Sequence, residues 1–600
     1  MSSDIPDRDE PCERAYETVE LGVLVVGAGA AGARTAIELV ERGVDPEDVL
    51  VIGKRSHGDA HTTWARGGIN GALGTHDPED DWTVHAADTL REGHFLNDPE
   101  KVQTVTRRMP PALRELDDWG MAYSRTADGG IDQRYFGAQS FRRTAFAGDH
   151  TGESLLETLI GRARELSVPY RENVFVTRLL ADDAGERLLG AAGFDTDTGE
   201  FVLFEADVVV LAAGGYTSLY ERHSSRDDEN TGDGPALAYQ AGARLMDVEF
   251  VQFHPTGMVG DRYGEDWDGR LVTEAVRGEG GRLFNAEGER FMERYSPDQM
   301  ELDARDVVAR AIDREVREGR GTEHGGVYLD ISHRDRDFIR ERLPRMYERF
   351  ADLGVDMAEE PVEVAPTAHY GMGGILVDGT GETDVDGLYA IGETMAGVHG
   401  ANRLGGNSLA ETVAFGAVTG EAIADRLLSG ASDGVDRSRL HDLARIHFED
   451  LRGLADTDGT HDPEALFDGL RGLLWEHAGI LRDGEGLSAG LDALADLRMR
   501  ASDLEVGGPT SRSFEFAMNL GFALDVAEAI LRGAAARTES RGAHARTDHP
   551  ETDPEWRRNL IVDRDSVGAM RLATRPVDDP SEAVQAALDA GYELDYHQLE

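Results

Sequence analysis

The chain contains 600 residues, which exceeds one ordinary domain and predicts about two to four domains with ample hydrophobic core. Its 61 Lys and Arg residues stand against 115 Asp and Glu residues, and the resulting net charge of −54 favours solubility and speaks against nucleic acid as a partner. The single cysteine, Cys12, excludes a disulfide framework, an iron–sulfur cluster and a cysteine-rich zinc site within the chain, so we predict no metal site.

The first 20 residues are acidic and contain neither the apolar segment of a secretory signal nor a twin arginine, and we expect residues 1–20 to form a frayed acidic arm. Nowhere does an apolar run approach the roughly 18 residues that a membrane-spanning helix needs. Lysine occurs only at positions 54 and 101, and an acid-rich, lysine-poor composition is typical of a halophile's cytoplasmic protein. We therefore expect a cytoplasmic location, with peripheral docking on the inner face of the cell membrane left open.

A βαβ unit is predicted directly after the arm. Residues 21–26 and 49–52 form two apolar runs that are typical of buried parallel strands, and the turn after the first run has the pattern G-x-G-x-x-G before a helix. Gly27 permits the tight turn, Gly29 lets a pyrophosphate approach the backbone, and Gly32 lets helix and strand pack closely. The helix N-terminus adds free N–H groups. We therefore predict a dinucleotide site that includes Gly27, Ala28, Gly29, Ala30, Ala31 and Gly32.

The identity of the dinucleotide follows from the end of the second strand. An NAD site usually carries an acid there, whereas this chain has Gly53 and Lys54. The glycine-rich segment that follows, residues 55–70, lies close enough in sequence to the pyrophosphate turn to cover a flavin. A flavin is therefore a candidate for the bound group.

The same segment resembles the flavoprotein subunits of succinate dehydrogenase and fumarate reductase, which carry His-Thr-x-x-Ala-Gln-Gly-Gly here. The matching residues are His61, Thr62, Ala65, Gly67 and Gly68. In that family the histidine bonds covalently to the flavin 8α-methyl carbon, so the resemblance implies covalent FAD through His61. His57, which follows Arg-Ser as the family histidine does, is a competing candidate. Arg66 stands where the family usually has Gln.

Later segments extend this resemblance. A buried strand predicted at 207–215 ends in a glycine pair and resembles the second dinucleotide signature of two-part FAD folds. In the family, the Asp of a Thr-Gly-Asp-Gly turn contacts FAD, and the glycine-rich start of a long helix suits the flavin's pyrimidine edge. The cofactor contacts implied outside the first glycine turn are Gly53, Lys54, His61, Thr62, Gly67, Gly68, Asp233, Glu393, Asn407, Ser408 and Leu409.

The predicted fold class is α/β, with a two-part Rossmann-like FAD-binding domain, an inserted α+β capping domain and a C-terminal helical domain. We place the FAD-binding domain at 21–248 and 369–436, the capping domain at 249–368, the helical domain at 437–550 and an extension at 551–600. Strands are expected at 173–180, 187–194, 200–204 and 326–330, and helices at 98–119, 437–452, 463–480, 486–503 and 514–533. Residues after about 570 show no resemblance that we recognise.

Oxidation of a four-carbon dicarboxylate requires that both carboxylates be held, that a hydride reach flavin N5 and that a proton leave the adjacent carbon. Arg403 is the predicted clamp because a guanidinium binds a carboxylate with two hydrogen bonds. The resemblance also assigns substrate binding to His254, Thr273 and His369. It assigns the proton step to Arg305, and we add Glu274 and Arg277 as a relay, since an arginine with a pKa above about 12 is a poor base in water.

The predicted function is that of a flavoprotein catalytic subunit which oxidises succinate to fumarate or performs the reverse reaction. The resemblance implies that electrons pass to an iron–sulfur subunit, then to quinone, with membrane anchor subunits bound through that partner. L-aspartate oxidase, which typically has Ser at the position of His61, and a soluble fumarate reductase are the alternative enzymes. A flavin-binding assembly protein would leave the retained clamp and relay residues unexplained. The physiological direction, the electron acceptor and the oligomeric state stay open.

Overall fold

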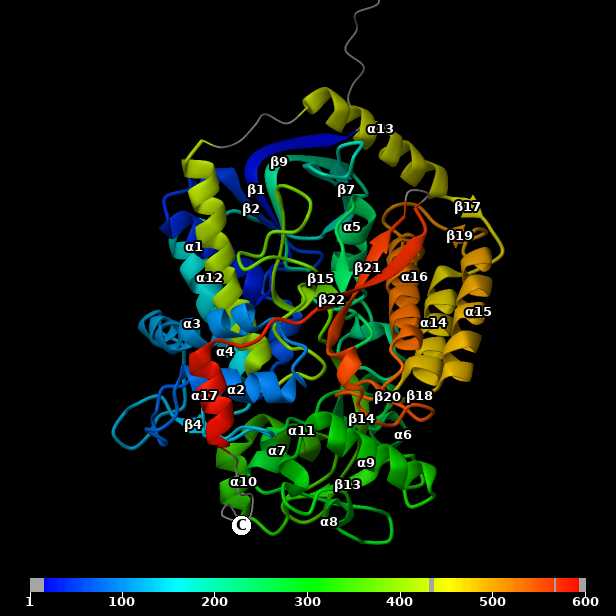
Figure 1. Ribbon diagram of the computed structural model, residues 1–600. Coiled ribbons are helices and arrows are strands. Elements are labelled where there is room, and N and C mark those ends of the chain that lie inside the picture. The colour runs from blue at the N-terminus through cyan, green and yellow to red at the C-terminus, as the bar shows by residue number, and fades with distance from the viewer. Residues whose placement is uncertain (1–15, 431–435, 566–567, 593–600) are drawn as a thin grey trace, which may run out of the picture.

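The computed structural model describes residues 16–430, 436–565 and 568–592. Most of the expected acidic arm and Cys12 lie outside these ranges. Figure 1 shows three regions: a sheet flanked by helices α1 and α12, a helical layer of α14, α15 and α16 along one side, and a lower region that carries α7 to α11. The architecture is mixed α/β, as predicted.

The central sheet has the strand order β6-β2-β1-β9-β8-β7, and β16 pairs with β9. Strands β1, β2, β6, β9 and β16 pair in parallel, whereas β7 and β8 run antiparallel to their neighbours. The strands are β1 (Glu17–Val26), β2 (Val49–Ile52), β6 (Tyr170–Arg171), β7 (Val174–Ala181), β8 (Leu188–Asp195), β9 (Phe201–Leu211) and β16 (Leu388–Ala390). This order places β1 at the centre, as a dinucleotide-binding sheet requires.

Two strand predictions need correction. Strand β1 begins at Glu17 instead of Leu21, because its first residues pair in parallel with β9 from Val202 onward. The acidic side chains can face solvent while the backbone joins the sheet, so charge alone was a poor guide to the end of the arm. Strand β9 is continuous from Phe201 to Leu211, where two separate strands had been expected.

Helices α1 (Ala30–Glu41) and α12 (Asn407–Leu428) pack against each other beside the sheet. Their close approach depends on two glycines of α12: a Cβ on Gly416 would lie 2.8 Å from Arg34 Cβ, and a Cβ on Gly420 would lie 2.7 Å from Glu38 Cβ. The chain segments that begin and end the FAD-binding region in sequence are thereby joined in space, and the N-termini of both helices face the same side.

The lower region of Figure 1 has its own hydrophobic core, to which Met258, Ile312, Leu329 and Phe350 contribute. Its antiparallel sheet has the order β11-β14-β13-β12, and helix α9 packs on it. The bounds are β11 (Val251–Met258), β12 (Arg282–Phe284), β13 (Val327–Asp330), β14 (Val362–Gly371) and α9 (Arg305–Arg317). The chain enters this region through β11 and leaves it through β14, and these two strands are paired.

Four helices after residue 436 lie at the expected positions, to within a few residues at each end: the three of the helical layer, and α13, which packs on the central sheet. They are α13 (Arg437–Leu454), α14 (Pro463–Ala478), α15 (Gly484–Arg500) and α16 (Arg512–Ala536). Leu466 of α14 and Phe514 of α16 are buried with the sheet residues in one hydrophobic cluster. No helix within the described parts of the chain has both the length and the apolar character that crossing a bilayer demands.

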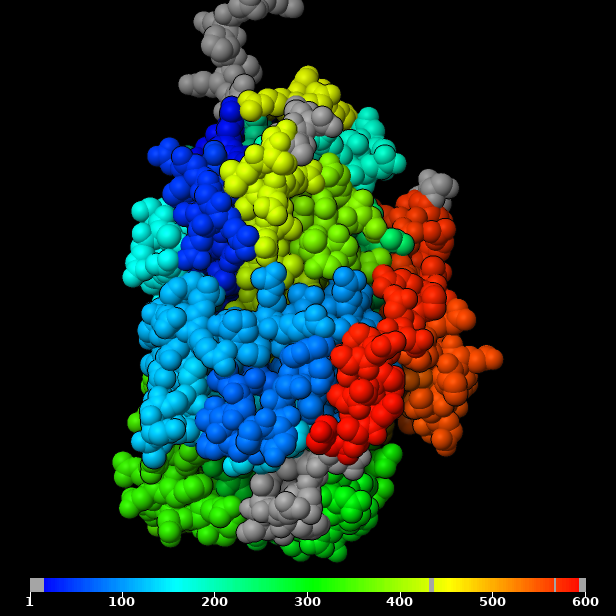
Figure 2. All heavy atoms as spheres, turned by 60° about the vertical axis from the view of Figure 1, so that its left-hand side comes forward, coloured from blue at the N-terminus to red at the C-terminus, as the bar shows by residue number. Residues whose placement is uncertain are grey.

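The C-terminal segment returns to the body of the protein. Strands β21 (Arg558–Arg564) and β22 (Met570–Pro576) form a hairpin that joins the sheet of β10 (Leu245–Met246) and β15 (Gly374–Ile375). Helix α17 (Glu582–Ala590) then packs its Val584 on α2 (Trp82–Glu92). Figure 2 shows this red segment lying across the blue segment that contains α2.

The glycine turn allows a test of the βαβ packing. A Cβ on Gly32 would lie 2.0 Å from the Gly27 carbonyl oxygen, so we expect Gly32→Ala to destabilise the protein by about 1–3 kcal/mol through overpacking. Gly161→Ala is the control, because its Cβ would meet nothing within 4 Å in the exposed interior of helix α4 (Thr151–Glu165); it should stabilise by about 0.5–1 kcal/mol. Denaturant unfolding measures both, and equal stabilities for the two variants would contradict this packing.

Candidate functional site

A continuous pocket begins at the carboxyl ends of the central strands and extends beneath the lower region. Its walls include the residues that follow β1, β2, β9 and β16, namely Gly27, Gly53, Ala212 and Gly392. Ligands of parallel sheets bind at this edge. Residues of β11, α9 and β14 also line the pocket, so one cavity extends from the edge of the central sheet to the lower region.

The turn between β1 and α1 fits a pyrophosphate. Gly27 has φ +114°, and a Cβ there would lie 2.2 Å from the Ala212 carbonyl oxygen, so the turn admits no side chain. Helix α1 has no side-chain cap on Gly29, which leaves N–H groups at its N-terminus for an anion. The Ala30 N–H donates to Thr62 Oγ1 at 3.1 Å, which brings the predicted flavin segment onto this turn.

Lys54 and Asp233, both predicted cofactor residues, meet at one end of the pocket with their Nζ and Oδ2 atoms 3.3 Å apart. Lys54 also donates to Asn519 Oδ1 at 2.9 Å and lies 4.2 Å from the Phe175 ring centre. Asn519 comes from α16, far away in sequence, and was not identified from sequence. Its sequence offers one sign of a special role, namely an Asn within the largely apolar helix α16.

The structure distinguishes the two candidate histidines. His61 lines the pocket, with Nδ1 3.6 Å from Glu229 Oε2, whereas His57 lies off the pocket and stacks on Tyr170 at 3.9 Å between ring centres. Burial lowers the pKa of His61, but the Glu229 carboxylate outweighs burial, and the pKa lies above its ordinary value. Glu229 was not identified from sequence.

Glu274 binds the Arg305 guanidinium at two nitrogens, with Oε2 2.7 Å from Nε and 2.6 Å from Nη2. Arg277 approaches the same oxygen at 3.7 Å, and its side chain is fully buried. Burial raises the pKa of Glu274, but the two arginines outweigh it and bring the pKa down to about 2. Glu274 is therefore a carboxylate in the resting protein, between two guanidiniums, and the three predicted relay residues are in contact.

Arg403 lies beside this group. Its Nη2 donates to Gln252 Oε1 at 3.1 Å, and Arg305 Nη1 donates to the same oxygen at 2.9 Å. Tyr370 packs under Arg403, with 4.5 Å between the guanidinium carbon and the ring centre. Burial, and next the charge of Arg305, lower the pKa of Arg403 to about 9. Gln252, which bridges the two arginines, was not singled out although it lies within a matched segment.

Two neutral histidines complete the polar lining. The rings of His254 on β11 and His369 on β14 are 5.3 Å apart and nearly perpendicular. His369 Nδ1 bonds Ser224 Oγ at 2.8 Å, and His254 Nδ1 accepts from the Thr256 N–H at 3.2 Å. Burial, and then Arg305, hold the pKa of both rings well below the ordinary value. His254 Nε2 is buried without a hydrogen-bond partner among the described residues, so it is free to bind a ligand.

Most of the other predicted residues line the pocket. These are Ala28, Gly29, Ala30, Ala31, Gly53, Thr62, Gly67, Gly68, Thr273, Glu393, Ser408 and Leu409. Gly32, Arg277 and Asn407 do not line it. Asn407 instead accepts from Asn70 Nδ2 and bonds His85 Nε2, both at 2.8 Å, and donates to Thr89 Oγ1 at 2.9 Å. Its side chain supports the start of α12 from behind.

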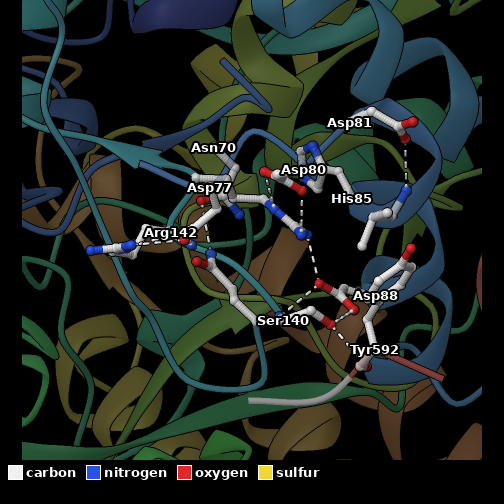
Figure 3. A network of polar contacts seen from close by, with 12 residues as sticks. Asn70, Asp77, Asp80, Asp81, His85, Asp88, Ser140, Arg142 and Tyr592 are labelled. Atoms are coloured by element: carbon white, nitrogen blue, oxygen red, sulfur yellow. Dashed lines mark hydrogen bonds and ion pairs between the residues drawn. The ribbon is translucent and has the colours of Figure 1, made fainter. Parts of the chain in front are cut away.

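Helix α2 carries this support, and Figure 3 shows His85 and Asp88 on it, with Ser140 and Tyr592 nearby. Asp88 accepts from the Ser140 hydroxyl at 2.7 Å and pairs with the fully buried Arg143 at 2.7 Å. Ser140 also donates to the Tyr592 carbonyl at 3.0 Å. The C-terminal segment is therefore linked to the wall behind the pocket.

Comparison with known proteins matches two family models: the FAD binding domain at residues 22–409 and the fumarate reductase flavoprotein C-terminal domain at 468–587. The expectation that residues after about 570 have no counterpart is therefore wrong, since the second match extends beyond that point.

Relatives of known name cover nearly the whole chain. It is 43% identical over 553 residues to a component of the fumarate reductase (CoM/CoB) of Methanothermobacter marburgensis, covering 91% of this chain and 98% of that protein. It is 37% identical over 594 residues to the succinate dehydrogenase flavoprotein subunit of Rickettsia conorii, covering 94% and 96%.

Solved structures agree with these relatives. FrdA of E. coli quinol fumarate reductase superposes with a TM-score of 0.87 at 34% identity, covering 95% of this chain and 99% of that one. Mycobacterium smegmatis Sdh1 superposes with a TM-score of 0.81 at 38% identity, covering 97% and 98%.

The lowered pKa of Arg403 predicts the pH range in which the pocket binds an anion. The Arg403 cation is present below about pH 9 and is lost above it, so the Kd of a dicarboxylate such as malonate should rise roughly tenfold for each further pH unit. Calorimetric titration measures the Kd, with circular dichroism as a control against alkaline unfolding. A Kd that is constant up to about pH 10.5 would contradict the assignment.

Proposed function

Because the chain belongs to the FAD-dependent succinate dehydrogenase and fumarate reductase flavoprotein family, a family of oxidoreductases, we propose that it interconverts succinate and fumarate. The main support for this proposal is that Arg305 and Arg403 both donate to Gln252 Oε1, in the pocket that also contains the glycine turn. Two guanidiniums side by side in a buried cavity suit a small molecule with two carboxylates.

Substrate binding is proposed for four side chains. Arg403 holds one carboxylate by its guanidinium, fixed in place by Gln252 and by the Tyr370 ring. His254 can donate from Nε2 while its Nδ1 accepts from the backbone, which fixes its tautomer. Thr273 and His369 line the same part of the pocket. Such positioning can account for several kcal/mol of the barrier, up to about 7–11 in favourable cases.

The proton step is assigned to Arg305. Its guanidinium contacts the Glu274 carboxylate at two nitrogens, so it can give a proton to Glu274 and accept one from carbon. Arg403 and Arg277 share the partners of Arg305, at Gln252 and Glu274 respectively. In succinate oxidation Arg305 takes the proton from carbon and passes it to Glu274, and Arg277 continues the relay; in fumarate reduction the proton moves the other way. Burial of all three side chains excludes water from competing for the proton.

The pocket fits FAD, with the glycine turn at the pyrophosphate, Lys54 and Asp233 at the opposite end from the substrate set, and Glu393, Ser408 and Leu409 along the wall. A bound FAD supplies the hydride acceptor for succinate, or the donor in the reverse direction. We also propose that His61 is the covalent attachment residue. Its place in the pocket and the anionic Glu229 beside its Nδ1 support this choice over His57.

Electrons are proposed to leave through an iron–sulfur subunit that is bound to membrane anchor subunits, which would place the protein at the inner face of the cell membrane. Within the described residues, no group of three or more His, Cys, Asp or Glu could hold a metal ion. The similarity to Sdh1, which was solved within a complex, supports a partner subunit. The division into FAD-binding, capping, helical and C-terminal parts at the boundaries given above stays a prediction.

The role of Arg305 can be tested by Arg305→Lys, which keeps the charge but loses the two-nitrogen contact with Glu274 and the bond to Gln252. Succinate turnover should fall by about 10²–10⁴-fold while flavin content stays at the wild-type level. Arg310→Lys makes the same change on α9, where the side chain bonds the Gly542 carbonyl, and should leave turnover near wild type. Retained turnover in Arg305→Lys would remove the assigned role.

Covalent attachment is tested by acid denaturation of the purified protein followed by a search for flavin fluorescence on the polypeptide. Flavin should stay on the chain in the wild type and in His57→Ser, and should be released from His61→Ser. Release from the wild type would instead favour a noncovalent relative such as L-aspartate oxidase. Loss of attached flavin only in His57→Ser would reverse the choice of histidine.

A further inference from the structure

Two arginines in the pocket wall lack the partners that most arginines of this protein have. The side chains of Arg66 and Arg349 form no hydrogen bond or ion pair with any residue of 16–430, 436–565 and 568–592, although both residues are half-buried. The chain has 115 acidic residues for 61 basic ones, so an unpaired guanidinium is not explained by a shortage of carboxylates. Both residues line the pocket that holds Arg305 and Arg403.

The two arginines come from opposite sides of the pocket. Arg66 follows the short helix η2 (His61–Trp64) on the sheet side, with its guanidinium carbon 5.9 Å from the Trp64 ring centre. Arg349 belongs to α11 (Pro344–Asp352) in the lower region, and its guanidinium carbon is 5.1 Å from the Trp267 ring centre. Arg270 adds a third guanidinium over Trp64, at 5.3 Å. Aromatic rings thus hold the cations where a carboxylate would otherwise do so.

The surrounding charges leave this region positive. The turn that contains Asp149 and Gly152 links the segments of the two arginines: the Gly152 N–H donates to the Ala65 carbonyl oxygen at 2.7 Å, and Asp149 binds the start of α11. Burial lowers the pKa of both arginines, to about 10 for Arg349, and repulsion by Arg66 is the next cause for Arg349. Two carboxylates, Asp149 and Glu153, act on Arg66 as well, but each also has another partner, and Arg345 and Arg270 add positive charge. Asp149 accepts from the backbone N–H groups of Arg345 and Met346. Glu153 lies 3.6 Å from the Arg345 guanidinium.

This region lies nearer to solvent than the substrate residues. Arg305 and Arg403 are only 6% and 2% exposed, whereas Arg66 and Arg349 remain partly accessible along the same cavity. The N-terminus of α1 is available to bind the FAD pyrophosphate. A dianion that approaches a protein of net charge −54 is repelled, so a local positive field at the entrance has a physical purpose.

We propose that Arg66 and Arg349 form an entrance site that binds small dianions, which, if the proposed function holds, are the dicarboxylate substrates on their way to Arg403. The site lies between the two sides of the pocket and is separate from the substrate set. Its effect is on capture: it raises the local concentration of the anion at the entrance and leaves the chemical step unchanged.

Quenching of tryptophan fluorescence in the purified flavoprotein tests the site without catalysis. Iodide, an anionic quencher, is compared with neutral acrylamide for the wild type and for the double variant Arg66→Gln/Arg349→Gln. We expect the ratio of iodide to acrylamide quenching to fall in the double variant, because Trp64 and Trp267 lie beside the substituted residues. Arg340→Gln, an exposed arginine of the same region outside the pocket, should leave the ratio unchanged.

Steady-state kinetics supply the second readout. In the double variant, kcat/KM for succinate should fall about tenfold at low ionic strength with kcat unchanged, and the difference should vanish in about 1 M salt. An unchanged quenching ratio, or a kcat/KM loss that persists at high salt, would overturn the entrance site. A lowered ratio in a protein that does not oxidise succinate would support the anion site and overturn the proposed function instead.

Discussion

A single buried carboxylate holds the centre of this protein together. Glu274 lies between Arg305 and Arg277, and without it these two buried guanidiniums would lack their shared carboxylate. Removing one partner of such a buried set costs about 3–5 kcal/mol, because the other charges are left uncompensated. Gln252 extends the arrangement by accepting from Arg305 and Arg403 with one oxygen. The anion pocket therefore depends on one carboxylate and one amide.

The fold brings these groups together through the paired strands β11 and β14. Gln252 and His254 lie on the first strand, and His369 lies on the second. The polypeptide chain therefore passes along the pocket both where it enters the lower region and where it leaves it. On the opposite wall, close packing of α1 and α12 aligns two helix N-termini with the sheet edge. A motion of the lower region about β11 and β14 would change access to the pocket without breaking the cofactor wall.

Sequence reasoning was strong where a residue's role is local and weak where it depends on distant neighbours. The glycine turn, the four late helices and the residues Arg305 and Arg403 follow from motif or periodicity. Asn519, Glu229 and Gln252 were not identified, because each acquires its role only from a side chain far away in sequence. Asn407 was expected in the pocket but faces α2, since a motif does not show which way an amide points. The start of β1 was predicted too late in the sequence, because its first residues include acidic side chains that face solvent.

The account as a whole requires that a dicarboxylate bound at Arg403 exchange electrons with a flavin in the same cavity. The most direct test is an anaerobic titration of the isolated flavoprotein with succinate, without any electron acceptor, while the flavin absorbance is recorded. We predict that succinate bleaches the oxidised flavin band and that fumarate restores it. A flavin that dithionite reduces but that succinate and fumarate leave unchanged would contradict the account.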